Sequence, residues 1–150
     1  MVVAEALHTS PTAAPPLRSV AGMDEDPRRK LGELGERIAE QHLEARGYRV
    51  IERNFRTRFG ELDLVVADDA SLVFCEVKTR VARGSPGPFG PLAAIGARKR
   101  RQVRLMAREW LAADTTRQRP RPPAMRFDAV GVTLDRGGRL IELEHLEEAF

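Results

Sequence analysis

Two carboxylates, Asp63 and Glu76, and the amine of Lys78 are the side chains of this sequence whose types and spacing could do chemistry. Converging carboxylates suit a hard divalent cation such as Mg²⁺, which takes oxygen ligands from the protein and from phosphate. Such an ion polarises a phosphodiester, and a nearby lysine orients a water or neutralises developing charge. The trio therefore predicts phosphodiester hydrolysis with Mg²⁺ or Mn²⁺. The bare pattern also fits a salt bridge from Lys78 to either acid, and this alternative stays open at this point.

These residues converge if segments 61–66 and 72–78 are the two strands of a hairpin. Both segments are rich in apolar and β-branched residues, and the turn between them is polar. Side chains alternate along a strand, so Glu76 and Lys78 share one face. If the first and last turn residues pair, the numbers of paired residues sum to 139. Asp63 then lies directly opposite Glu76, with their Cβ atoms about 5 Å apart.

A helix is expected over residues 28–46, with Gly47 as its C-terminal cap. Two apolar stripes follow it at helical spacing: Leu31, Leu34, Ile38 and Ala45 on one, and Gly32, Ala39 and Leu43 on the other. Glu36 lies along the second stripe. Its carboxylate should therefore border a packed surface rather than open water.

The remaining elements complete a single α/β domain over residues 27–150. They are a strand over 48–54, a helix over 92–112 and strands over 127–134 and 139–143. The core face of the second helix should carry Val103, Met106, Ala107 and Trp110. The order is α-β-β-β-α-β-β, which predicts a mixed β-sheet flanked by helices.

Composition excludes several classes of protein. The chain has 150 residues, and no apolar run reaches the roughly 18 residues of a membrane span. Cys75 is the only cysteine, which excludes an intrachain disulfide and a cysteine zinc cluster; we expect it to be a small core residue and the protein to be cytoplasmic. The three histidines lack metal-site spacing, and His42 is interpreted as structural.

The first 26 residues differ from the rest of the chain. They are rich in alanine and proline, end in an acidic cluster and show no apolar period, so we expect a disordered leader. They lack the basic start and continuous apolar stretch of a secretory signal. Met23, next to the ordered part, is a candidate translation start.

Positive charge is concentrated in one stretch of the sequence. The net charge is only +3, yet residues 98–126 hold ten basic residues against two acidic ones. Such a segment favours a polyanionic partner, although a solvated arginine-rich surface is an equal alternative. On the second helix, Lys99 falls on the side that faces the protein. The polar side carries Arg101, Arg104 and Arg108, with Arg98 nearby.

The motifs around the two acids resemble the signature of the YraN-type family of small bacterial proteins. The matching runs are Gly60-Glu61-Leu62-Asp63-Leu64 and Phe74-Cys75-Glu76-Val77-Lys78-Thr79-Arg80. The resemblance spans residues 31–150 and includes the opening helix with Glu36, the segment with Lys99 that enters the second helix, and the last strands. It implies a restriction-endonuclease-like fold, related to that of archaeal Holliday-junction resolvases.

The resemblance also implies roles for single residues. Asp63 and Glu76 would be metal ligands together with the Val77 carbonyl, and Lys78 would be the catalytic lysine. Glu36 would be the helix carboxylate that joins the site, and Lys99 would approach the substrate phosphate. The family-level substrate is branched or flapped DNA, and cleavage of two strands would suit a homodimer.

Three functions compete on the sequence alone. The first is a metal-dependent nuclease whose arginines hold the DNA backbone without reading sequence. The second is a nucleic-acid-binding protein that keeps the fold without the chemistry. The third is an interaction protein whose basic face meets an acidic partner. Aromatic residues make up only 5% of the chain, which disfavours recognition of single strands by stacking.

Overall fold

The computed structural model of the protein describes residues 26–83, 92, 95–113, 122 and 124–150. Two helices and five strands follow one another in the predicted order, so the predicted fold class, a mixed sheet flanked by helices, is confirmed. Their bounds are α1 Pro27–Ala45, β1 Arg49–Thr57, β2 Gly60–Ala67, β3 Ser71–Val81, α2 Ala97–Ala112, β4 Ala124–Leu134 and β5 Leu140–Leu146. The predicted leader lies outside the described residues except for Asp26.

Helix α1 begins and ends at residues suited to those places. The carboxylate of Asp26 accepts a hydrogen bond of 3.0 Å from the backbone N–H of Arg28, and Pro27 occupies the first turn. Just past the end, Gly47 has a φ of +93°, a conformation that favours glycine. The helix buries Gly35, Ala39 and Leu43. Ala45 was predicted on an apolar stripe but is exposed, as the last residue of the helix.

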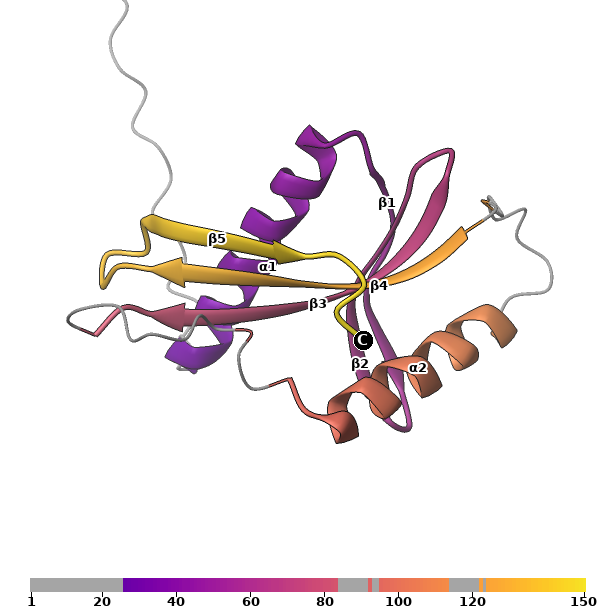
Figure 1. Cartoon of the computed structure of the whole chain (residues 1–150). Helices are drawn as coiled ribbons and strands as arrows, with labels where there is room; N and C mark the ends of the chain where they lie inside the picture. Colours follow the sequence, from indigo (N-terminus) through magenta and orange to yellow (C-terminus); the bar gives the residue numbers. More distant parts are fainter. Residues whose placement is uncertain (1–25, 84–91, 93–94, 114–121, 123) are drawn as a thin grey trace, which may run out of the picture.

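The five strands form one sheet in the order β1-β2-β3-β4-β5. All neighbours are antiparallel except β3 and β4, whose parallel pairing needs the crossover that contains α2. The predicted hairpin register is confirmed, since β2 and β3 pair from Ala67–Leu72 to Leu64–Cys75 with numbers that sum to 139. Strands β1 and β2 run at a steep angle to β3, β4 and β5 (Figure 1).

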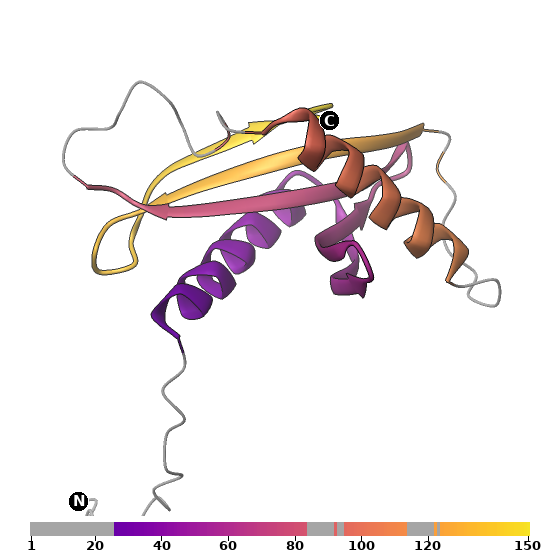
Figure 2. The same ribbon diagram turned by 90° about the horizontal axis from the view of Figure 1, so that it is seen from below.

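The two faces of the sheet carry separate hydrophobic clusters. On one face, α1 packs over residues such as Leu64, Val73 and Cys75; Figure 2 shows α1 along one side of the layer formed by β3, β4 and β5. On the other face, α2 packs over Leu62 and Phe74. The buried residues of α2 are the four predicted from their spacing: Val103, Met106, Ala107 and Trp110. Cys75 is fully buried, as expected.

Helix α2 starts five residues later than predicted. Gly96 precedes its first residue in an extended conformation, with φ −85° and ψ 172°, and has no side chain that could continue the apolar pattern. Leu92 is buried outside the helix, so its apolar character reflects core packing and not helical periodicity. Residues 84–91 and 93–94 lie outside the described part of the chain.

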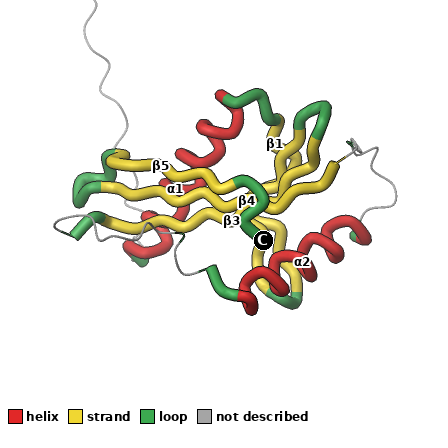
Figure 3. Tube along the Cα trace, viewed as in Figure 1, coloured by secondary structure: helices red, strands yellow, loops and turns green. Residues whose placement is uncertain are grey.

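The C-terminal segment returns across the sheet after β5 (Figure 3). The backbone N–H of Ala149 donates to the carbonyl of Phe127 at 2.8 Å, and Phe150 packs against the cluster beneath α2. Within the described residues, neither helix is long and apolar enough to span a lipid bilayer.

Candidate active site

Strands β2 and β3 separate at Asp63. Their ladder ends at the pair Leu64–Cys75, and beyond it the carboxylate of Asp63 accepts a hydrogen bond of 2.7 Å from the backbone N–H of Val77. The side-chain alternation of β2 also breaks here, since Leu62 packs beneath α2 and Leu64 beneath α1. The acid thus replaces a backbone acceptor where the two strands diverge, and its side chain points toward β3.

Glu76 is the most buried carboxylate of this region, with 4% of its surface exposed. Two amines share one of its oxygens: the Nζ of Lys99 at 2.7 Å from Oε1, and the Nζ of Lys78 at 3.3 Å. The other oxygen, Oε2, is buried and has no hydrogen-bond partner among the described residues. Buried polar atoms are nearly always paired, so an unpaired carboxylate oxygen calls for a partner such as an ion.

Burial and the neighbouring Glu76 together raise the pKa of the Asp63 carboxyl to about 8. The hydrogen bond from Val77 and the charge of Lys99 act in the opposite direction and are outweighed. The charge of Glu76 opposes ionisation of the partly buried Asp63, and a cation between the two acids would relieve this repulsion. This is the electrostatic pattern of a cation site, a feature that a surface salt bridge would lack.

Glu36 borders this site from α1 and is half-buried, as the helix pattern predicted. Its Oε2 accepts a hydrogen bond of 2.8 Å from the side-chain amide of Asn54, which also donates to Glu61 at 3.1 Å. Burial is the largest cause of a raised pKa at Glu36, and the charges of Glu61, Glu33 and Glu76 add to it. We call Asp63 and Glu76 together the acidic centre. Glu36 is coupled to this centre electrostatically, and the hydrogen bond from Asn54 orients its carboxylate.

The sequence interpretation missed Asn54. This residue adopts a φ of +49°, which asparagine tolerates better than most residues, and it lies between the β1 partners of Leu62 and Leu64, opposite Asp63. Its side chain therefore reaches carboxylates from α1 and β2. The asparagine in an otherwise regular strand pattern was the available signal.

The predicted basic residues divide into two groups along α2. Lys99 faces inward to Glu76, while Arg98 and Arg101 line a groove at the first half of the helix. Arg104 is held by the carbonyl of Phe150 at 3.0 Å, and Arg108 lies exposed one turn further on. The structure thus brings Lys99 into the acidic centre and keeps the arginines on the surface beside it.

Among the described residues, no group of three or more His, Cys, Asp or Glu side chains forms a ready-made metal site. The donor set is smaller: the carboxylates of Asp63 and Glu76, with the backbone of Val77 beside them. Two carboxylates with backbone oxygen and water are a usual environment for Mg²⁺. The unpaired Oε2 of Glu76 fits such an ion.

Known relatives match most of the chain. The model of an uncharacterised protein family, UPF0102, matches residues 35–132. The chain belongs to this family. A UPF0102 protein of Geobacter metallireducens is 40% identical over 122 residues, which cover 81% of this chain and 93% of that protein. One of Frankia alni is 45% identical over 122 residues, 80% and 93% of the two chains, and one of Mycobacterium avium is 43% identical over 123 residues, 80% and 89%. The resemblance to the YraN-type family is thereby confirmed.

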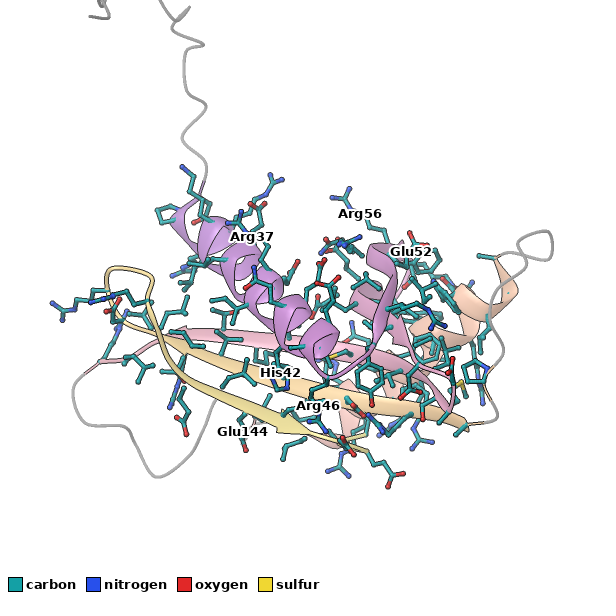
Figure 4. The ribbon with its side chains drawn as sticks, turned by 90° about the horizontal axis from the view of Figure 1, so that it is seen from above. Arg37, His42, Arg46, Glu52, Arg56 and Glu144 are labelled. Carbon is teal, nitrogen blue, oxygen red and sulfur yellow. The ribbon has the colours of Figure 1, made fainter. Side chains whose placement is uncertain are left out.

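This UPF0102 protein has a second buried polar cluster, away from the acidic centre. The fully buried Asp128 accepts hydrogen bonds from Arg126 at 2.8 and 2.9 Å and lies 2.8 Å from Nε2 of His145. His145 in turn lies 3.2 Å from His42 and 3.1 Å from Arg46. Figure 4 shows His42 and Arg46 where the end of α1 meets the sheet.

The cluster ties the C-terminal segment to α1. Burial raises the pKa of Asp128, but hydrogen bonds from His145, Arg126 and the backbone of Glu148 outweigh it and lower the pKa overall. Burial lowers the pKa of His42, because it disfavours the charged imidazolium, and the charges of His145 and Arg46 lower this pKa further. Every oxygen of Asp128 has a partner, unlike those of Glu76, so this cluster is a satisfied structural network.

Proposed function

We propose that this protein is a metal-dependent nuclease that hydrolyses DNA phosphodiester bonds. The observation that carries the proposal is the state of Glu76, whose Oε1 binds two lysines while its buried Oε2 has no partner. A purely structural carboxylate would be expected to satisfy both oxygens. An oxygen left open beside a second acid, Asp63, suits a site that completes itself with a cation.

Asp63 and Glu76 would hold the cation, Mg²⁺ or Mn²⁺, with the carbonyl of Val77. The N–H and C=O of one strand residue point to the same side, and the N–H of Val77 already meets Asp63. The Val77 carbonyl is therefore directed toward the same gap between β2 and β3. When bound, the ion would supply a Lewis acid to the phosphodiester and its attacking water.

The lysines and Glu36 supply the remaining chemistry in this proposal. Lys78 is about half exposed at the rim, so its ammonium can orient a water or meet charge that develops on the phosphate. Lys99 is more buried and comes from a different element, α2, which suits it to hold a phosphate oxygen in place. Glu36 has a raised pKa, borders the two acids from α1 and is oriented by the hydrogen bond from Asn54, as suits a proton acceptor.

DNA as the substrate is supported by the surface beside the site. The exposed side of α2 carries arginines that extend from the acidic centre along the helix: Arg98, Arg100, Arg101, Arg104 and Arg108. Guanidinium groups in such a row contact phosphates and give binding that falls with salt but reads little sequence. Branched and flapped DNA are the substrates to try first.

The test is cleavage of labelled linear, flapped and four-way-junction DNA in Mg²⁺ or Mn²⁺, with Glu76→Gln purified in parallel. Wild-type protein should cleave at least one shape. The variant should lose cleavage by a factor of about 100 or more, since it lacks a ligand charge, while its DNA binding stays equal or improves. Glu44→Gln makes the same chemical change at an exposed position of α1 and should leave cleavage unchanged. Cleavage that survives Glu76→Gln at full rate would overturn the assignment.

The arginine row of α2 also suits a protein that binds nucleic acid without cleaving it. That function predicts salt-sensitive binding by both the wild type and Glu76→Gln, with no cleavage of any shape in either metal. Binding without salt dependence would instead favour an acidic protein partner. The same panel of substrates therefore separates all three functions.

A further inference from the structure

A groove of about 830 Å³ lies between the β1–β2 turn and the first half of α2. Its lining combines two chemistries. Phe59 and Leu105 are apolar, and Leu105 is an exposed large side chain at 36%. Arg98, Lys99 and Arg101 are basic. An aromatic ring, an aliphatic side chain and cations around one open groove are groups that can bind a base and its phosphate together.

The turn that carries Phe59 is fixed to α2. The side-chain amide of Gln102 donates a hydrogen bond to the carbonyl of Phe59. Gly60 follows with a φ of +133°, and a Cβ there would lie 2.7 Å from the amide nitrogen of Gln102, so the turn and the helix are in close contact. The guanidinium of Arg58 lies 4.8 Å from the centre of the Phe59 ring and is held by Glu109 at 2.8 Å. Phe59 is thus pre-positioned by its surroundings.

The groove is continuous with the acidic centre through Lys99. This residue lines the groove, and its ammonium lies 2.7 Å from Oε1 of Glu76. A chain held by the groove therefore leads directly to the proposed scissile position.

We propose that this groove binds one unpaired nucleotide of the DNA strand to be cleaved, next to the acidic centre. Its base would rest against Phe59 and Leu105, and Lys99 and Arg101 would contact its phosphates. The inference rests on the proposed nuclease function and names its substrate class: DNA with a single-stranded segment at the cleavage point. The groove offers one aromatic ring beside its cations, and stacking on such a ring needs a base face that a duplex hides.

The test is binding of full-length protein, in EDTA, to a blunt DNA duplex and to the same duplex with a single-stranded extension. Fluorescence anisotropy at fixed salt gives both dissociation constants. The wild type should prefer the extended DNA by roughly tenfold, the size of one base–aromatic stack. Phe59→Leu keeps apolar bulk against the core but removes the ring, and should abolish most of this preference. Phe59→Trp should retain it.

Two arginines of the same helix provide a matched control. Arg101 lines the groove, whereas Arg108 lies two turns away outside it, and both are exposed. Arg101→Gln should weaken binding of the extended DNA several-fold more than Arg108→Gln does. Equal losses from both substitutions, or equal affinity of wild-type protein for the two DNAs, would overturn the groove assignment.

The outcomes also separate this inference from the function on which it rests. Cleavage in Mg²⁺ without a Phe59-dependent preference would leave the nuclease in place and overturn the groove. A Phe59-dependent preference without cleavage in either metal would support the groove as a nucleotide site and overturn the nuclease.

Discussion

The acidic centre should make the metal-free protein less stable as pH rises, and Asp63→Asn should remove that penalty. In the folded protein the pKa of Asp63 is about 8, against 3.8 for an ordinary aspartate. Between these values the folded state keeps a proton that the unfolded state loses. Stability is therefore fully present below pH 3.8 and declines as pH rises toward 8.

The magnitude follows from the separation of the two pKa values. Each pH unit is worth 1.36 kcal/mol, so an isolated group would cost roughly 4 kcal/mol by pH 7. Asp63→Asn removes this cost, and because Asp63 is coupled to the charge of Glu76 we expect the measured change to be smaller than the full value for an isolated group. We expect the free energy of unfolding of Asp63→Asn, relative to wild type, to improve by about 2–4 kcal/mol between pH 4 and pH 8. The amide oxygen of asparagine can still accept from Val77.

The assay is urea unfolding in EDTA at a series of pH values, followed by circular dichroism. Asp69→Asn is the control, because Asp69 is fully exposed in the turn after β2 and should give a curve parallel to that of the wild type. Added Mg²⁺ should stabilise the wild type most at high pH, where the carboxylates are free to bind, and should leave Asp63→Asn unchanged. Parallel wild-type and Asp63→Asn curves would refute the coupled, buried carboxylates on which the metal site depends.

Two further perturbations test the scaffold around the site. Gly35→Ala should destabilise the protein by about 1–3 kcal/mol, because its Cβ would lie 1.8 Å from Oγ1 of Thr79, whereas Gly32→Ala meets open space and should be neutral or stabilising; thermal unfolding of both variants checks this. Asp128→Asn should cost about 3–5 kcal/mol at pH 7, since it removes the fully buried charge that pairs with Arg126 and His145 and leaves Arg126 only the partly exposed Glu147 at 3.6 Å. Because the pKa of Asp128 is lowered, its ionised form adds to the stability of the wild type above pH 3.8, and this stabilisation is lost on acidification. The difference in free energy of unfolding between wild type and Asp128→Asn should therefore become smaller as pH falls.

Local patterns carried most of the fold. Strand alternation and a short polar turn were enough to predict the register of β2 and β3, because a hairpin leaves few ways to align two strands. Helical spacing identified the buried side of α2, since burial on one face is what the spacing encodes. The ends of the helices were less predictable. Leu92 is apolar because it packs in the core outside α2, and periodicity alone cannot distinguish such a residue from the first residue of a helix.

Contacts between distant segments were beyond the sequence. His42 and His145 are in contact although they lie 103 positions apart in the sequence. Neither residue belongs to a pattern that predicts contact with the other. The same holds for Asn54, whose bond to Glu36 depends on an unusual φ and on how α1 crosses β1. In the acidic centre, the hairpin register predicted that Asp63 and Glu76 lie on neighbouring strands. It did not predict that Lys99 would pair with Glu76, or that one oxygen of Glu76 would be buried without a partner among the described residues.

That unpaired oxygen distinguishes the two polar clusters of the protein. Around Asp128, donors from three segments satisfy one buried acid, and removal of any partner costs stability. Around Glu76, two acids are buried together, the donors crowd onto one oxygen, and the other is open. Folding alone would favour replacing such an acid by a neutral residue. The metal-free chain retains an unfavourable arrangement that a divalent cation would relieve, and this imbalance is the physical reason to assign chemistry to this cluster and structure to the other.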